Sequence, residues 1–339
     1  MSEPMWTQDR VIKAAEQVFR RLTYDKPKEA NWFFELFGAG NTPYANRPFE
    51  RFTHYDRLMR VLLESDAQKL KCMHKGTPYY FLGWTAFQMG RFETALIYMD
   101  LAVAEDMRAN PAGWRENPAG SFMMLNPDGG AASDIVREIR AILGKQMQRH
   151  RASCDGEEAS IDEFVLRLTN EFLRPGDSER SMDRSIVGLL YVFLLEFQTR
   201  FSELQLRCDN SGTIQPFVSH LFKGALLFES LLNHWYGEGL KKPTITRLFK
   251  GEAFKNDRGK ATLDTTADDL NAVLVAMRGK LTWVSAFSAC SKLRNTMGHR
   301  VQWKDDFNED GNYQLMFEWV TSAILFLLLA KLPVPTEQE

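Results

Sequence analysis

The sequence predicts an all-α protein, and three observations support this fold class. Apolar residues recur at the three- and four-residue spacing of an amphipathic helix in nearly every periodic segment. No run of alternating polar and apolar residues is bounded by hairpin turns, as β-strands would be. Hydrophobic residues make up 44% and charged residues 25% of the 339, which supplies enough apolar material for a core and excludes a disordered chain.

The first part of the chain contains several expected helices. An amphipathic helix over 8–24 is followed by a loop rich in Gly, Pro and Asn around 38–48 and by a second helix over about 55–71. Three Asn-Pro pairs and several glycines in 109–130 predict a loop. A further helix is expected over about 132–149.

Between these elements, residues 76–107 resemble one tetratricopeptide (TPR) helical hairpin. The residues that match the offsets of this repeat are Leu82, Gly83, Gly90, Phe92, Ala95, Met99 and Ala102. Small residues let two antiparallel helices approach closely, and Gly90 would form the tight turn between them. One repeat of about 34 residues cannot bury its own face, so neighbouring helices must stack on it. A plain helical hairpin with the same small residues is the alternative.

The sequence also predicts two domains. A polar stretch after residue 150 and a turn sequence before residue 182 mark the boundary. We expect a TPR-like helical domain over 1–150, a linker over 151–181 and a second domain over 182–339. Four helices with wide apolar faces in the second domain are typical of a four-helix bundle. They are expected at about 185–206, 216–236, 267–297 and 312–332, with a basic, solvated loop at 241–260.

The segment 293–300, LRNTMGHR, holds the sharpest group of functional candidates. Arg294 and His299 are separated by four residues, and Asn295 follows the arginine. The motif ends one long amphipathic helix and precedes an apolar one. In this context it resembles the motif of the HEPN domain family, whose ribonucleases carry an arginine, a polar residue and a histidine at this spacing between their last two long helices. The resemblance covers about 182–332 and implies a HEPN-like four-helix bundle with endoribonuclease activity and a homodimer in which two motifs face one cleft.

These side chains also suit RNA cleavage on chemical grounds. RNA supplies its own nucleophile, the 2′-hydroxyl, so cleavage needs a proton acceptor, a proton donor and positive charge on the transition state. His299, with an ordinary pKa of about 6.5, would transfer protons. Arg294 would hold phosphate oxygens with its planar guanidinium, and Asn295 would orient the phosphate or the histidine. This chemistry calls for no metal and no cofactor.

Two further residues are expected to support the motif. Five steps along a regular helix place positions 294 and 299 about 140° apart, so we expect Gly298 to end the helix and let His299 turn toward the arginine. Glu229 lies among apolar residues of its helix, and a partly buried carboxylate needs a cation. Arg294 is a candidate partner. Such a pair would either fix the guanidinium for catalysis or be purely structural.

Local charge favours a polyanionic partner, although 42 Lys and Arg against 44 Asp and Glu give a net charge of only −2. No Asp or Glu occurs between residues 270 and 304, where several cations are found. An RNA backbone could be held there by phosphate contacts, with solvated helix faces as the alternative. The substrate-binding candidates are Arg300, Lys292 and Lys304.

The composition predicts a cytoplasmic protein. The four cysteines are far apart and form no Cys-x-x-Cys pair, which indicates a reducing compartment without disulfides or a zinc site. The N-terminus has no signal-peptide pattern. No stretch is expected to reach the roughly 18 apolar residues of a membrane span.

A free ribonuclease would harm its own cell, so we expect the N-terminal domain to bind a protein or ligand regulator. The HEPN resemblance implies a toxin or an effector of bacterial stress or antiviral defence. Two other functions stay open. One is an adaptor that binds RNA, a nucleotide or a protein segment without cleavage, and the other is a helical scaffold.

Overall fold

The computed structural model describes residues 8–21, 44, 46–153, 159–174, 181–206, 213–241, 243–259, 261–266, 269–299 and 310–333. Within these ranges the regular elements are helices and no strand occurs, which confirms the all-α class. The chain divides into two compact units, one comprising 1–136 with 175–181 and the other 137–174 with 182–339.

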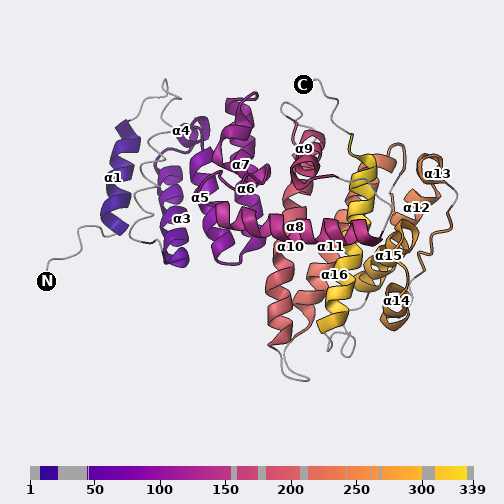
Figure 1. Cartoon of the computed structure of the whole chain (residues 1–339). Coiled ribbons are helices and arrows are strands. Elements are labelled where there is room, and N and C mark those ends of the chain that lie inside the picture. The colour runs from indigo at the N-terminus through magenta and orange to yellow at the C-terminus, as the bar shows by residue number, and fades with distance from the viewer. Residues whose placement is uncertain are drawn as a thin grey trace. The chain divides into compact units, whose positions relative to one another are not determined.

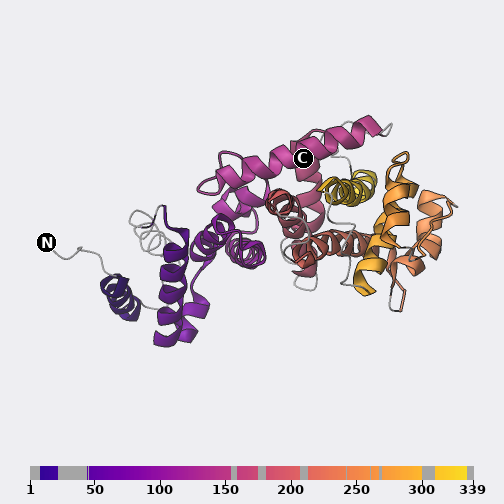
Figure 2. The same cartoon turned by 90° about the horizontal axis from the view of Figure 1, so that it is seen from below.

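The first unit is a succession of helices in which α1 lies against α3, α3 against α5 and α5 against α6 (Figure 1, Figure 2). Its elements are α1 (Gln8–Arg21), α3 (Pro48–Ser65), α4 (Ala67–Cys72), α5 (Gly76–Gln88), α6 (Phe92–Ala109), the 3₁₀ helix η1 (Trp114–Glu116) and α7 (Pro118–Met123). The single helix expected over 55–71 is therefore two, because Asp66 leaves the helical conformation and its side chain caps α4 by accepting from the backbone of Lys69. The loop expected over 109–130 also holds η1 and α7.

The hairpin expected over 76–107 is confirmed as α5 and α6. Gly90 adopts a φ of +67° in the turn, a conformation that favours glycine. A Cβ on Gly83 would stand 3.0 Å from Met99 Cγ and 3.3 Å from the carbonyl oxygen of Ala95, so a larger residue would push the two helices apart. The small residues thus act as expected, and their assignment to a TPR repeat stays a prediction.

The core of the first unit contains an arginine that sequence reasoning did not single out. Arg51 is 1% exposed, lies 4.1 Å from the ring centroid of Trp84, and donates from Nε to Thr85 Oγ1 at 3.2 Å. Its Nη2 donates to Gln88. Burial lowers the pKa of this guanidinium. The two hydrogen bonds give its Nε and Nη2 donor groups partners inside the core.

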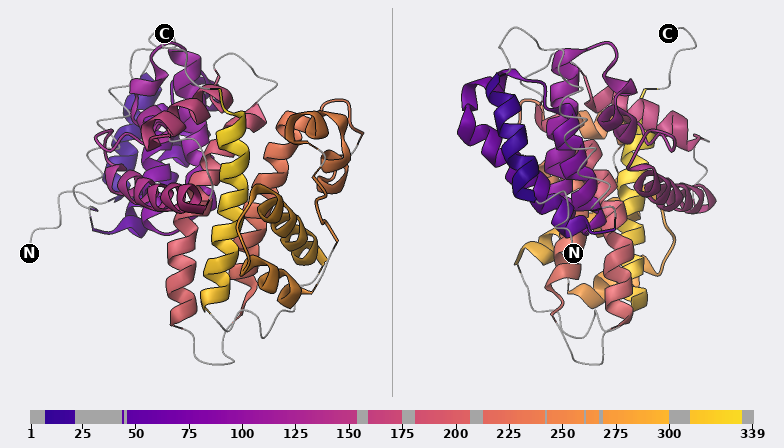
Figure 3. Two further views of the ribbon diagram at one scale, coloured as in Figure 1. Left: turned by 45° about the vertical axis from the view of Figure 1, so that its right-hand side comes forward. Right: turned by 90° about the vertical axis from the view of Figure 1, so that its left-hand side faces the viewer.

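Within the described residues, the second unit holds five helices of 17 to 25 residues and several shorter ones (Figure 3). Its elements are α8 (Ser133–Ser153), which begins before residue 137, α9 (Ile161–Phe172), α10 (Ser181–Gln205), α11 (Gln215–Tyr236), α12 (Ile245–Lys250), α13 (Glu252–Arg258), α14 (Leu270–Met277), α15 (Trp283–His299) and α16 (Asp310–Lys331). α16, yellow in Figure 3, lies against α11 and α15.

Three expectations for this unit need correction. The expected linker 151–181 contains α9, most of whose apolar side chains are buried, and the second unit already includes most of α8. The expected helix over 267–297 is divided into α14 and α15 by residues 278–282. There, Thr282 and Ser285 cap α15 reciprocally, since each backbone N–H donates to the hydroxyl of the other. The basic segment 241–260, expected as a loop, holds α12 and α13.

An aromatic cluster joins three of the long helices. The ring of His220 on α11 stacks on Phe193 of α10, with centroids 4.7 Å apart, and lies 5.9 Å from Phe317 of α16. His220 Nε2 donates to the carbonyl oxygen of Phe193 at 2.7 Å, and the hydroxyl of Tyr313 donates to His220 Nδ1 at 2.7 Å. A Cβ on Gly224 would stand 2.5 Å from Phe193 Cε2, so glycine is required where α10 and α11 cross.

The last helix corrects the expectation about membrane spans. Residues Gly311–Lys331 are long and apolar enough to cross a membrane by length and composition, because the apolar run continues upstream of Val320 with Glu318 as its only nearby charge. Of the apolar window, 72% is buried inside the protein. A helix buried in a protein core passes the same test of length and composition.

Candidate nucleic-acid site at the end of α15

The packing of α15 sets the position of the motif. The buried residues of this helix recur every three or four positions, and they include Phe287, Cys290, Leu293 and Met297. Arg294 follows one of them and lies at the edge of the buried face, with 32% of its side chain exposed. The fold therefore leaves this arginine within reach of a ligand while one side of it faces the protein.

The protein side of Arg294 is bound to Glu229 of α11. Arg294 Nε donates to Glu229 Oε2 at 2.9 Å, and Nη2 lies 3.5 Å from Oε1. Both carboxylate oxygens thus face one side of the guanidinium, and the N–H groups of Nη1 are not part of this pair. The contact considered from the sequence is present, and whether it serves catalysis or only stability stays a prediction.

Asn295 is held by a segment that sequence reasoning did not find. Its Nδ2 donates to the carbonyl oxygen of Thr265 at 3.1 Å. In the same segment, the backbone N–H of Asp264 donates to Ser288 Oγ at 3.2 Å, and the Asp264 carboxylate lies 2.6 Å from Lys292 Nζ. Residues 261–266 therefore run along α15 with contacts about one helical turn apart. No sequence signal links these residues to the motif, since they have no periodicity and no special spacing.

Lys292 is consequently an ion-pair partner as well as a candidate for substrate binding. Its side chain is 11% exposed, and the nearby ammonium lowers the pKa of Asp264 to about 2. RNA would have to compete with this carboxylate for the lysine. The role of Lys292 in RNA binding stays a prediction.

The end of α15 overturns the expectation for Gly298. The helix continues through His299, so Gly298 does not end it before the histidine. Positions 294 and 299 accordingly remain about 140° apart around the helix axis. The side chain of His299, and Arg300 and Lys304 entirely, lie outside the described residues, so their expected roles stay predictions.

A cleft of about 340 Å³ lies beside Asn295. It is bounded by α12, α13 and the segment 261–266, and its lining includes Thr265, whose carbonyl oxygen accepts from Asn295. Two ammonium groups from the basic segment, those of Lys250 and Lys255, also line it. Glu252 pairs with Lys255 at 3.0 Å. The cleft is suited to an anion because both charged residues in its lining are cationic.

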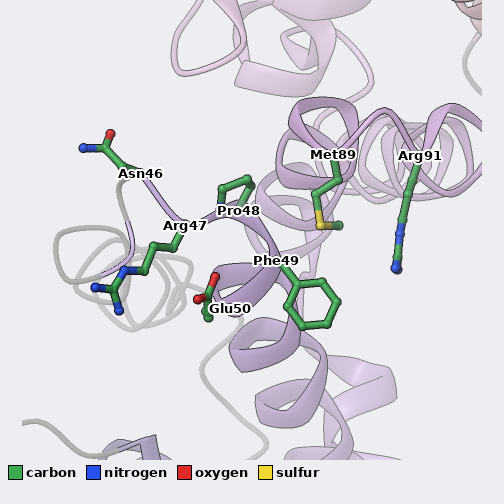
Figure 4. Close-up of a pocket in the computed structure, with 7 residues that line it drawn as sticks. All are labelled: Asn46, Arg47, Pro48, Phe49, Glu50, Met89 and Arg91. Atoms are coloured by element: carbon green, nitrogen blue, oxygen red, sulfur yellow. The ribbon is translucent and has the colours of Figure 1, made fainter. Parts of the chain in front are cut away.

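A second hollow, of about 520 Å³, lies in the first unit (Figure 4). The phenyl ring of Phe49, 61% exposed, and the side chain of Met89 lie between Arg47 and Arg91, with Glu50 beside the ring. The hollow thus presents a small apolar surface with charged side chains around it.

Among the described residues, no group of three His, Cys, Asp or Glu side chains is placed to hold a metal ion. Comparison with known proteins adds no assignment: no family model, no curated protein and no solved structure matches the chain.

Proposed function

We propose that the protein is a metal-independent endoribonuclease whose second unit cleaves RNA at the C-terminal end of α15. The observation that supports this function best is the Arg294–Glu229 pair, which fixes one edge of a partly exposed guanidinium. An arginine fixed in this way is pre-organised to bind a phosphate with its remaining N–H groups. The neighbouring cleft with Lys250 and Lys255 would hold the adjoining RNA backbone.

The reaction would proceed within the RNA itself. A base removes the proton of the 2′-hydroxyl, whose oxygen attacks the adjacent phosphorus, and the bond to the 5′-oxygen breaks as that oxygen takes a proton. Arg294 would stabilise the charge on the non-bridging oxygens, Asn295 would orient the phosphate, and His299 would carry one of the two proton transfers. The products are a 2′,3′-cyclic phosphate and a 5′-hydroxyl.

The geometry of α15 favours a homodimer as the active form. Because positions 294 and 299 lie about 140° apart on a continuous helix, one chain does not place both on one face. Two copies related by a twofold axis would bring Arg294 of one chain and His299 of the other to the same phosphate.

The first unit would restrain or trigger this activity. Its hollow around Phe49 and Met89 offers an apolar contact flanked by two guanidinium groups, which suits a protein or ligand regulator (Figure 4). A regulated cytoplasmic ribonuclease of this kind would serve as a toxin or as an effector of stress or antiviral defence.

The proposal is tested by incubating the protein with end-labelled RNA in excess EDTA. The parent should produce fragments with 2′,3′-cyclic phosphate ends, and His299→Ala and Arg294→Ala should not. His234→Ala is the matched control and should leave cleavage intact. It also removes an imidazole from the second unit, but one that contacts Glu171 and not the motif. Cleavage that persists in His299→Ala, or that requires added Mg²⁺, would contradict the proposal.

One observation favours a second candidate, an RNA-binding protein without cleavage. Glu229 and Asp264 each neutralise a cation that the ribonuclease would use. Such pairing leaves a weakly basic surface that could hold RNA without stabilising a transition state. Three results together would support this function. The parent protein should bind RNA, the RNA should stay intact with and without divalent ions, and Lys250→Glu should weaken the binding.

A further inference from the structure

A second basic cleft lies at the other end of α15. It has a volume of about 580 Å³ and is formed by the end of α8, the connection between α14 and α15, and the first turns of α16. The helix that separates it from position 299 rises about 24 Å between Trp283 and His299. The cleft is therefore distinct from the candidate RNA site.

The charged groups that line this cleft are all cationic. Arg149 comes from α8, and Arg278 and Lys280 come from the connection before α15. Arg278 and Lys280 are exposed, so their charges are available to a ligand. Among the lining residues there is no Asp or Glu. Such a set attracts an anion that carries more than one negative charge.

The two arginines are held in place by neighbouring side chains. Arg149 Nη1 forms an ion pair with Glu318, and Gln314 Nε2 donates to the other carboxylate oxygen at 2.9 Å. Arg278 Nη2 lies 3.4 Å from Asn312 Oδ1. Burial lowers the pKa of Arg149, and the Glu318 carboxylate offsets part of its charge. The side chain is still 39% exposed, so a bound anion could contact the part of the guanidinium that faces the cleft.

The rest of the lining is apolar. Met277, Leu281, Leu315 and Trp319 form a surface next to the three cations. A phosphate alone would use the cations and leave this apolar surface unused, whereas a nucleoside phosphate would use both. The volume also lies in the range of roughly 300–1,000 Å³ typical of sites for molecules of this size.

We propose that this cleft binds a nucleoside phosphate, with its phosphates on Arg149, Arg278 and Lys280 and its base against Leu281 and Leu315. The site does not depend on the proposed ribonuclease activity, because it uses none of the residues of the motif at the other end of α15.

The test is calorimetric titration of the full-length protein with ATP, ADP, inorganic phosphate and a short single-stranded RNA. ATP and ADP should bind, and phosphate should bind more weakly by at least about tenfold, because it makes no apolar contact. Arg278→Glu and Lys280→Glu should each weaken ATP binding by at least about tenfold, since each replaces an attraction with a repulsion. Both residues are exposed, so these variants are expected to fold.

Two controls locate the site. Lys145→Glu makes the same charge change at an exposed position of α8 outside the cleft, and it should leave ATP binding unchanged. Arg294→Ala should also leave ATP binding unchanged while it abolishes RNA cleavage, which separates this site from the proposed ribonuclease site. The proposal is overturned if ATP does not bind, or if Arg278→Glu and Lys280→Glu leave ATP binding unchanged. It is also overturned if phosphate binds as tightly as ATP, or if these two variants weaken the binding of RNA but not that of ATP.

Discussion

Replacement of His220 by glutamine should make the protein less sensitive to mild acid. His220 is fully buried, and its two hydrogen bonds define its state: Nε2 must carry a proton to donate to the carbonyl oxygen of Phe193, and Nδ1 must be free of one to accept from Tyr313. Burial is the largest cause that lowers the pKa of this imidazole, to about 4. A glutamine amide offers one donor and one acceptor but does not titrate in this range.

The size of the effect follows from the two pKa values. In the unfolded chain His220 has a pKa of about 6.5, so between pH 6.5 and pH 4 the unfolded state binds a proton that the folded state does not. The contribution of the neutral imidazole to stability is therefore complete above pH 6.5 and is lost as the pH falls toward 4. Between pH 7 and pH 5 this loss amounts to about 2 kcal/mol.

The assay is urea unfolding of the parent and of His220→Gln at pH 7 and pH 5, followed by tryptophan fluorescence. His150, whose pKa burial also lowers to about 4, is present in both proteins and cancels in the comparison. The parent should lose about 2 kcal/mol more of its unfolding free energy than the variant. Equal losses would refute the reasoning and mean that His220 is not held neutral among the aromatic rings.

Three further substitutions test the packing of the two units by urea unfolding at pH 7. Gly224→Ala should destabilise the protein by about 1–2 kcal/mol, because overpacking against Phe193 outweighs the gain in helix propensity. An unchanged or raised stability would show that α10 and α11 do not cross so closely. Thr85→Val should cost about 2 kcal/mol, since it removes the acceptor of the buried Arg51 Nε; a cost under about 0.5 kcal/mol would mean that Arg51 does not lie there. Phe49→Ser should change stability by less than about 0.5 kcal/mol, and a large loss would show that this ring is covered rather than exposed.

Helical periodicity predicted the fold class and most helices, but the sequence did not mark where they are interrupted. Asp66 and the pair Thr282 and Ser285 end or begin helices through local hydrogen bonds, which compete with a periodic pattern that continues across them. The sequence did not predict α9, because this helix is only 12 residues long and lies between two polar stretches. A helix of this length depends on tertiary packing of its apolar side, which a local pattern does not reveal.

The candidate site was predictable where one helix carries it. Arg294 and its partner Glu229 were found because a carboxylate among apolar residues requires a cation. Asp264 and Thr265 were not, since their contacts depend on how residues 261–266 run along α15. The termination expected before His299 was wrong because α15 includes His299; a glycine lowers helix propensity but does not by itself end a helix.

The most direct test of the central claim is the rate of RNA cleavage in EDTA by an equimolar mixture of Arg294→Ala and His299→Ala proteins, refolded together so that their subunits exchange. Random exchange makes about half of the dimers mixed, with one chain of each variant. If each cleft takes its arginine from one chain and its histidine from the other, every mixed dimer regains one of its two sites. The mixture should then recover about a quarter of the parent's rate, although each variant alone is inactive. A mixture as inactive as its components, while the parent cleaves RNA, would contradict the shared site. Cleavage by either variant alone would contradict the role of its missing residue.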